Sequence, residues 1–196
     1  MALVLLLSMA LAGYALGGCV PAGYGADAIW IAYHFDTSAD GWRIAADTVD
    51  VDATFRAEGG APGGYIVGTD EAAGETWYFS APASLLARLP TAEGGVLRFS
   101  LKQSETTGGY IDDDVVIQGP AGRLSYRFAA APGVEWRKFA VPLTARAGWR
   151  WNWNAEATDA QMRSVLRDAT RLHIRGEFVT GPDEGALDEV VLLAPR

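Results

Sequence analysis

His173, Arg175 and Glu177 follow one another at a spacing of two residues near the C-terminal end of the chain. Alternate side chains of a β-strand point to the same side of the sheet, so a strand here places all three on one face. An arginine fork beside a carboxylate and an imidazole can hold sugar hydroxyls or a carboxylate group. The same side chains can also form a structural ion pair across strands. The spacing therefore predicts either a ligand-binding face or a structural one.

Trp149, Trp151 and Trp153 show the same spacing of two residues. In an extended segment the three indoles line up on one side, and sugar rings stack on such a row. We expect Trp149 to belong to the core. Trp151 and Trp153 alternate with asparagines, and exposed aromatic side chains tend to mark interaction surfaces. They are therefore candidates for contact with a ligand or a partner.

Three adjacent carboxylates, Asp112 to Asp114, could hold a cation, but alternation along a strand lets at most two of them converge. Because Gly108 and Gly109 precede them, we expect solvated carboxylates in a loop. The sequence has two histidines and contains no Gly-x-Ser-x-Gly, His-Glu-x-x-His or phosphate-loop pattern. A carboxylate pair for glycoside hydrolysis is the remaining catalytic option. We expect that the protein is not an enzyme.

The chain opens with an apolar stretch, residues 2–16, followed by two glycines and the single cysteine, Cys19. Such a stretch is too short to span a bilayer and is typical of a secretory signal. Leu-Gly-Gly directly before a cysteine resembles a bacterial lipobox. We expect a signal peptide over residues 1–18, a lipidated Cys19 in a flexible tether over 19–28, and one domain over 29–196. The predicted location is the bacterial cell envelope, as an exported lipoprotein held on a membrane. The alternative is an ordinary signal peptide with a chance cysteine.

Composition narrows the choice of partners. Without residues 1–18 the chain keeps 178 of its 196 residues, which suits one domain with its own core. The formal net charge is −8, and no block of basic residues occurs. This argues against nucleic acid and against adhesion to anionic lipid, which leaves the acyl anchor as the expected membrane contact. One cysteine allows no internal disulfide, so the fold must depend on its core, or on its core and a bound metal.

Short apolar or alternating runs between Gly, Pro and Asp clusters predict strands. We expect them near residues 29–35, 42–46, 51–56, 64–68, 75–80, 95–103, 114–119, 123–129, 135–142, 170–179 and 186–193. A short helix is predicted over residues 82–89. A second begins after Thr158, which forms a capping box with Gln161, and continues with Met162, Val165 and Leu166 at helical spacing. So many short strands indicate a sandwich or jelly roll.

Several short motifs occur along the chain in a particular order. They are Phe35-Asp36, Asp40-Gly41-Trp42, Gly63-Gly64-Tyr65-Ile66, Thr76-Trp77-Tyr78-Phe79, Gly94-Gly95-Val96-Leu97, Asp113-Asp114-Val115-Val116, Gly148-Trp149, Ile174-Arg175-Gly176-Glu177-Phe178 and Leu187-Asp188-Glu189-Val190. In this order they resemble a laminin IV type A domain, also called the laminin B domain, over residues 35–193. The resemblance implies an all-β, galactose-binding-like β-sandwich (jelly roll) with one or two short helices, in an extracellular setting. Animal members lie among cysteine-rich modules that this sequence lacks, so a basement-membrane role is not implied.

Many sandwiches of this type hold a structural calcium ion between the first strand and the last, and the resemblance implies such a site here. Asp36 follows the first strand and Asp188 lies in the last, while Asp70 and Asp40 could complete the site. Calcium takes six to eight oxygen ligands, so backbone carbonyls would also be needed. The alternative is that Asp36 begins a turn and that Asp188 bonds to the backbone or to Arg175.

Together these features predict a non-catalytic binding or adhesion module of the cell envelope or the extracellular space. We expect its partner to be carbohydrate or an envelope protein. The candidate ligand-binding residues are Trp151, Trp153, His173, Arg175 and Glu177. The alternative function is a structural or assembly lipoprotein of the envelope without a small ligand.

Overall fold

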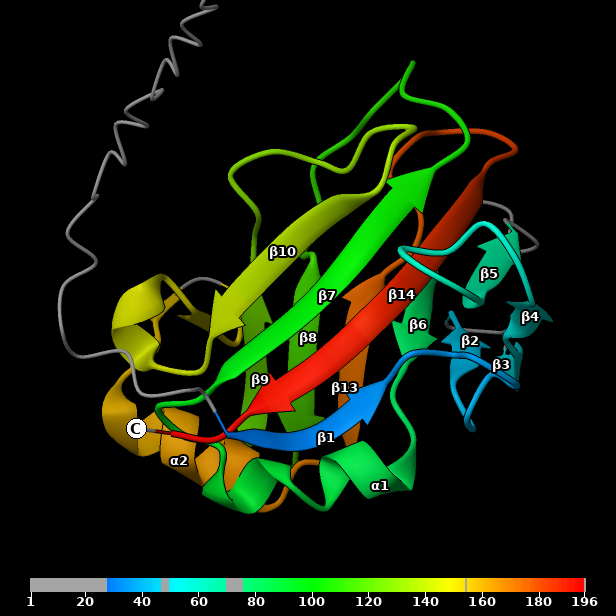
Figure 1. The fold of residues 1–196 in the computed structure, drawn as a ribbon. Coiled ribbons are helices and arrows are strands. Elements are labelled where there is room, and N and C mark those ends of the chain that lie inside the picture. Colours follow the sequence, from blue (N-terminus) through cyan, green and yellow to red (C-terminus); the bar gives the residue numbers. More distant parts are fainter. Residues whose placement is uncertain (1–27, 47–49, 70–75, 154, 196) are drawn as a thin grey trace, which may run out of the picture.

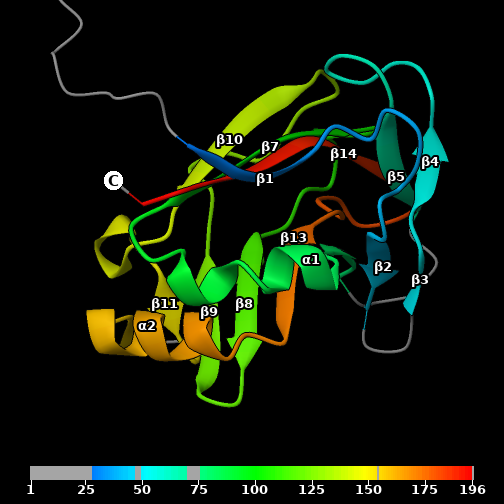
Figure 2. The ribbon, with the colours of Figure 1, turned by 60° about the horizontal axis from the view of Figure 1, so that its bottom comes forward.

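The computed structural model describes residues 28–46, 50–69, 76–153 and 155–195. They form two antiparallel β-sheets that pack face to face (Figure 1). Turning the ribbon forward separates the sheets into two layers, with the first and last strands side by side in one of them (Figure 2). The predicted all-β sandwich with short helices is confirmed. Cys19 and Asp70 lie outside the described residues.

Sheet I contains six strands, with the longest strand, β14, near its centre. Its main spatial order is β10 (Arg137–Pro142), β7 (Val96–Gln103), β14 (Glu184–Leu193), β5 (Tyr65–Thr69) and β4 (Thr54–Arg56), and β1 (Ile29–Tyr33) also pairs with β14. Because Ile29 is in register with Leu193, the first and last strands meet at one end of the sandwich. This is the juxtaposition on which the predicted calcium site depends.

Sheet II contains eight strands and lies behind sheet I in Figure 1. Its spatial order is β12 (Ala155–Glu156), β11 (Arg150–Trp151), β9 (Gly122–Tyr126), β8 (Val115–Gly119), β13 (Arg171–Arg175), β6 (Tyr78–Ser80), β2 (Arg43–Ala45) and β3 (Asp50–Asp52). The predicted strand at 51–56 is two strands, because the chain leaves sheet II at Ala53 and enters sheet I with β4.

Both α-helices lie at the same end of the sandwich (Figure 1). Helix α2 (Asp159–Arg167) starts at the predicted capping box, in which Thr158 and Gln161 each accept from the other's backbone amide. The predicted first helix is confirmed only in part: α1 (Ala83–Leu86) ends at Ala87, and a 3₁₀ turn, η1 (Leu89–Thr91), follows. A second 3₁₀ turn, η2 (Ala145–Ala147), precedes β11. These segments close the core from below.

The core lies between the two sheets and combines alternate residues of the strands with three fully buried tryptophans. Trp42, Trp77 and Trp149 are at most 1% exposed. Trp77 packs against the backbone of Gly176, where any side chain would overlap its indole.

No helix in the described part of the chain is long and apolar enough to cross a membrane.

Candidate functional site

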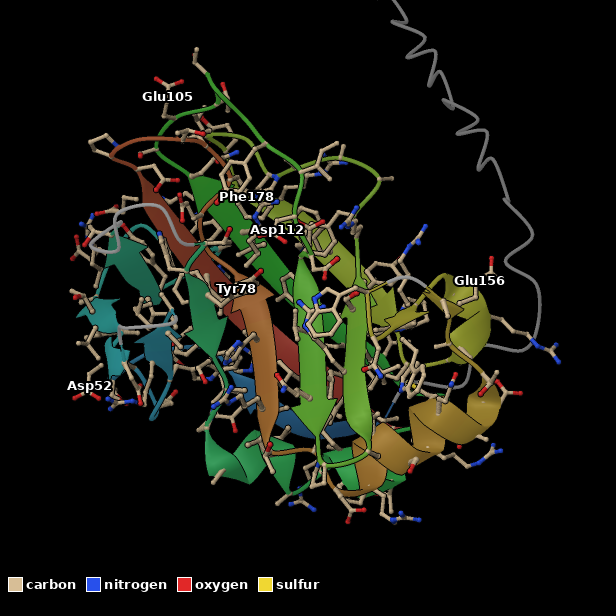
Figure 3. The ribbon with its side chains drawn as sticks, turned by 180° about the vertical axis from the view of Figure 1, so that it is seen from behind. Asp52, Tyr78, Glu105, Asp112, Glu156 and Phe178 are labelled. Carbon is tan, nitrogen blue, oxygen red and sulfur yellow. The ribbon has the colours of Figure 1, made fainter. Side chains whose placement is uncertain are left out.

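The outer face of sheet II carries polar side chains that the strands hold in a fixed arrangement. The strand register places Ser80, His173, Val116, Ser125 and Arg150 next to one another on five neighbouring strands. The residues that alternate with them along these strands are buried in the core, so this row faces away from it. Figure 3 shows the molecule from behind, with this face toward the viewer, and labels Tyr78 on β6 and Asp112 in the loop before β8.

Tyr78 and His173 form a stacked ring pair near the middle of this face. Their ring centroids are 5.5 Å apart, with 25° between the ring planes, because they are diagonal neighbours on β6 and β13. Burial, and repulsion by the cations of Arg171 and Arg123, lower the pKa of His173 to about 4. The imidazole is therefore neutral at pH 7. Burial also raises the pKa of the Tyr78 hydroxyl, so that the pair is an uncharged, partly buried aromatic surface.

Asp113 bridges two arginines across the same face. Its carboxylate accepts from Arg123 Nη1 at 2.6 Å and from Arg127 Nε at 2.9 Å. Asp114 accepts from the Phe128 amide at 2.7 Å. Asp113 and Asp114 are both buried, so the expectation of solvated loop carboxylates is wrong for these two residues. The sequence could not reveal that Arg123 of the next strand, β9, and Arg127 just after it reach back to neutralise the carboxylate of Asp113.

The predicted trio at β13 is divided by the structure. His173 and Arg175 share the outer face, but β13 ends at Arg175, so Glu177 lies beyond the strand. Arg175 is 2% exposed, and its guanidinium donates to the carbonyls of Glu177 and Tyr110 and to the Asp114 carboxylate. Glu177 is buried too and accepts from the Trp77 amide. Arg175 and Glu177 therefore hold loops together, and His173 is the member of the trio that reaches the accessible face.

The three tryptophans do not form a row. Trp149 is fully buried and donates to the Pro142 carbonyl at 2.8 Å, which confirms it as a core residue. Trp151 is partly buried against the core. The chain reverses after β11, with positive φ angles at Asn152 and Trp153, because β11 pairs with β12 in a hairpin. Trp153 is 63% exposed, and the Arg123 guanidinium lies 5.3 Å from its ring centroid. Trp153 therefore stands on the outer face.

Asp36 and Asp188 both lie next to the loop that leads into β5. Asp188 is fully buried and accepts from the amides of Ala61 at 2.5 Å and Glu189 at 2.6 Å. Burial raises the pKa of its carboxyl to about 6. Asp36 is exposed in a bend, next to Gly63. The described residues contain no cluster of three or more His, Cys, Asp or Glu side chains placed to hold a metal. Backbone carbonyls would have to supply most ligands of a calcium ion here.

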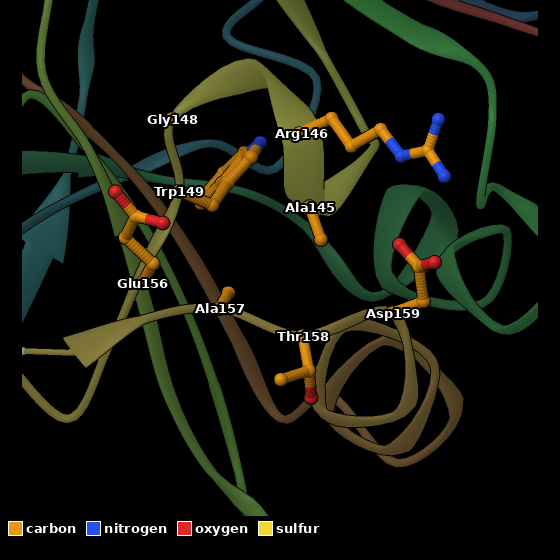
Figure 4. Close-up of a pocket in the computed structure, with 8 residues that line it drawn as sticks. All are labelled: Ala145, Arg146, Gly148, Trp149, Glu156, Ala157, Thr158 and Asp159. Carbon is orange, nitrogen blue, oxygen red and sulfur yellow. The ribbon is translucent and has the colours of Figure 1, made fainter.

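A pocket of about 380 Å³ lies at the other end of the domain, between η2 and the start of α2 (Figure 4). Charged side chains of Arg146, Glu156 and Asp159 stand around it, and Trp149 forms part of its wall. The indole N–H of Trp149 is already bonded to a carbonyl, and the capping box occupies the first turn of α2. The outer face of sheet II offers more accessible aromatic surface and is the stronger candidate.

The amino-acid sequence matches one known protein family. A sequence model described as Laminin B (Domain IV) matches residues 78–194, more than half of the chain. The chain belongs to the laminin B family. The match includes most of sheet II, and it includes β7, β10 and β14 of sheet I. No curated protein matches the sequence of this laminin B domain.

Solved structures place the domain among β-sandwich modules. The L4b domain of human laminin alpha-2 is 13% identical, with a TM-score of 0.67, over 85% of this chain and 97% of that one. The carbohydrate-binding module CtCBM11 is also 13% identical, with a TM-score of 0.53, over 87% and 98%. A family 22 carbohydrate-binding module of Clostridium thermocellum Xyn10B is 9% identical, with a TM-score of 0.50, over 87% and 97%. At these identities the likeness shows the fold.

Several residues of this face were missing from the sequence-based candidates. Tyr78 could have been found, because it alternates with Trp77 and Phe79, and two adjacent aromatic residues of one strand cannot both face the core. Arg123 and Arg171 gave no such signal. Their position beside the ring pair depends on how β9 and β13 are ordered in the sheet.

Proposed function

We propose that this laminin B domain is a non-catalytic binding module that recognises carbohydrate through the outer face of sheet II. The observation that carries the proposal is the exposed Trp153 beside Arg123, on the same face as the Tyr78–His173 ring pair. Tryptophan is enriched at interfaces, because it combines a large apolar ring with a polar N–H. Here the aromatic groups stand next to hydrogen-bonding side chains.

The chemistry of the face suits a sugar. The apolar C–H side of a pyranose ring can stack on the Trp153 indole, and the neighbouring donors and acceptors can bond its hydroxyls. Gln118 and Arg171, both exposed, lie in register on β8 and β13. Side chains based on strands are held more accurately than side chains on loops, which favours orientation-specific hydrogen bonds. The likeness to carbohydrate-binding modules in fold supports the same conclusion.

A glycan array of the soluble domain, followed by calorimetry on the positive glycans, tests the proposal. Trp153→Ala should fold normally and lose at least tenfold in affinity, about 1.4 kcal/mol. Ile29→Ala is the matched control, because Ile29 is 62% exposed, as Trp153 is, but lies on β1 of sheet I. Saturable binding that survives Trp153→Ala would place the sugar elsewhere and contradict the proposal.

The alternative function, an assembly protein without a small ligand, has one observation in its favour. Ile111 is 84% exposed and Val134 is 55% exposed, in the loops before β8 and β10. Such residues fit a protein partner better than a sugar. Binding to isolated envelope proteins, together with a negative glycan array, would favour this alternative. Ile111→Ser would then weaken that binding, whereas Trp153→Ala would leave it unchanged.

We also propose that the domain is exported and anchored to a membrane of the bacterial envelope through acyl chains on Cys19. The motif Leu-Gly-Gly-Cys supports this, and eight residues separate Cys19 from Ala28, the first described residue. Mass spectrometry of the mature protein should find the acyl groups on Cys19, and Cys19→Ser should release the protein from membranes or leave it uncleaved. An unmodified amino terminus further along the chain would contradict the anchor.

A further inference from the structure

The outer face of sheet II concentrates arginines in one region, although the chain as a whole is acidic. Along one row, the register places Arg171, Gln118 and Arg123 on three neighbouring strands, β13, β8 and β9. Trp153 stands next to Arg123 at the end of this row. Two strand spacings separate the two arginines, roughly 10 Å. A cation, an exposed amide, a second cation and an indole therefore lie in sequence across the sheet.

Most arginines of this face form ion pairs with carboxylates. Arg43 pairs with Asp50 and Asp52 at the far edge of the sheet. Arg123 and Arg127 share the single carboxylate of Asp113.

Two exposed arginines remain. In the described part of the chain, Arg171 makes no ion pair and no side-chain hydrogen bond, and Arg150, opposite Glu156 in register, makes no ion pair within 4.0 Å. Within the described residues, Arg171 is therefore the guanidinium of this row that no carboxylate neutralises.

The pKa of His173 indicates the sign of the electrostatic potential beside Arg171 and Arg123. Its ring lies one row from Arg171 and is surrounded by Arg171, Arg123 and, more weakly, Asp50. After burial, the two cations are the main causes that depress the pKa of the imidazole. A positive potential thus acts on the His173 ring, whereas at the Tyr78 hydroxyl the strongest charge effect comes from the Asp112 carboxylate. At physiological ionic strength charges further away than about 8 Å are largely screened, so the net charge of −8 does not cancel the potential at His173.

We infer that the ligand of this face is an acidic glycan, whose anionic group is held by Arg171 while a neighbouring sugar ring stacks on Trp153. This inference rests on the proposed carbohydrate-binding function. The planar guanidinium matches a carboxylate or a sulfate with two parallel hydrogen bonds, and the Gln118 amide can bond a hydroxyl between the two anchors. A nucleic acid is disfavoured, because the row offers one exposed aromatic ring and few free cations.

Calorimetry with a uronic-acid polysaccharide, its carboxyl-reduced neutral counterpart and a sulfated polysaccharide tests the inference. The acidic polymers should bind at least tenfold more tightly than the neutral one, and the advantage should shrink between 50 and 300 mM salt. The two acidic polymers reveal whether carboxylate or sulfate is preferred. Arg171→Gln should weaken the binding of the acidic polymers until their affinity equals that of the neutral polymer. Arg146→Gln, which removes the same charge from η2, should change neither affinity.

Three results separate the possible failures. Neutral glycans bound as tightly as acidic ones, with dependence on Trp153, would overturn the acidic-glycan inference and leave the proposed function standing. The absence of binding to any glycan would overturn both. A DNA oligonucleotide bound as tightly as the acidic glycans, with the same dependence on Arg171, would overturn the inference by revealing a general polyanion site. Without any ligand, the pKa of His173 measured by NMR should rise in Arg171→Gln, and an unchanged value would refute the electrostatic premise.

Discussion

Replacing each of Trp149, Trp151 and Trp153 by alanine should produce three different losses of stability. Trp149 is fully buried in the core, and its indole N–H donates a hydrogen bond to the Pro142 carbonyl. Truncation of a buried aromatic side chain costs about 3–5 kcal/mol, and here it also leaves a carbonyl without its donor. In a domain of this size, 1 kcal/mol corresponds to about 2–4 °C. Trp149→Ala should therefore lower the melting temperature by roughly 6–20 °C.

Trp153→Ala should cost little, because Trp153 is 63% exposed and its one ring contact is the Arg123 guanidinium. Loss of an exposed cation–π contact amounts to about 0.5–1 kcal/mol. Trp151→Ala should fall between the two. It packs against the core, but its buried indole N–H has no hydrogen-bond partner among the described residues, so its removal also relieves an unfavourable burial.

Differential scanning calorimetry of the three variants measures the order of these losses. The expected order of destabilisation is Trp149, then Trp151, then Trp153. A loss at Trp153 as large as that at Trp149 would refute the argument, because it would show that the Trp153 indole is buried in solution. The sugar-stacking role would then have no exposed ring on which to act.

Three further changes test other parts of the structure. Gly176→Ala should destabilise by about 1–3 kcal/mol or more, because the new methyl group overlaps the Trp77 indole, whereas Gly133→Ala, with open space around it, should be nearly neutral in the same urea titration. The pKa of His173 is about 4 in the folded protein against an ordinary 6.5, so protonation of the imidazole opposes folding. The free energy of unfolding is therefore undiminished by this residue above pH 6.5 and falls as the pH decreases towards 4. His173→Gln should flatten the pH dependence of stability in that window by an amount on the order of 3 kcal/mol, and an unchanged profile would contradict the burial of the ring. If calcium binds at Asp188, it should raise the melting temperature of the wild type and not that of Asp188→Asn. At a free calcium concentration 100 times the dissociation constant, the gain in stability is about 2.7 kcal/mol. A wild type whose melting temperature changes with neither calcium nor chelator would exclude the site.

The sequence predicted the strands of the sandwich well because their apolar residues alternate. The capping box at Thr158 likewise fixed the start of α2, since its hydrogen bonds are local. The hairpin of β11 and β12 was missed. Asn152 and Trp153 adopt positive φ angles, which tryptophan seldom does, so nothing in the spacing of the tryptophans announced a reversal.

The candidate site was predicted less completely, because period-two spacing shows which residues share a face but not what covers that face. His173 and Arg175 do lie on the same face of β13. Arg175 is nevertheless buried, because its guanidinium lies against the rings of Tyr110 and Phe178, which belong to two other loops. The contact with Tyr110 joins residues far apart in the sequence, and local patterns do not contain it.

An NMR titration of the labelled domain with the tightest glycan found on the array tests the central claim most directly. We predict that the largest amide shifts fall on β8, β9, β11 and β13, with the side-chain signals of Trp153 and His173 among them. Shifts concentrated instead on sheet I, or around the pocket between η2 and α2, would contradict the claim that the outer face of sheet II binds the carbohydrate.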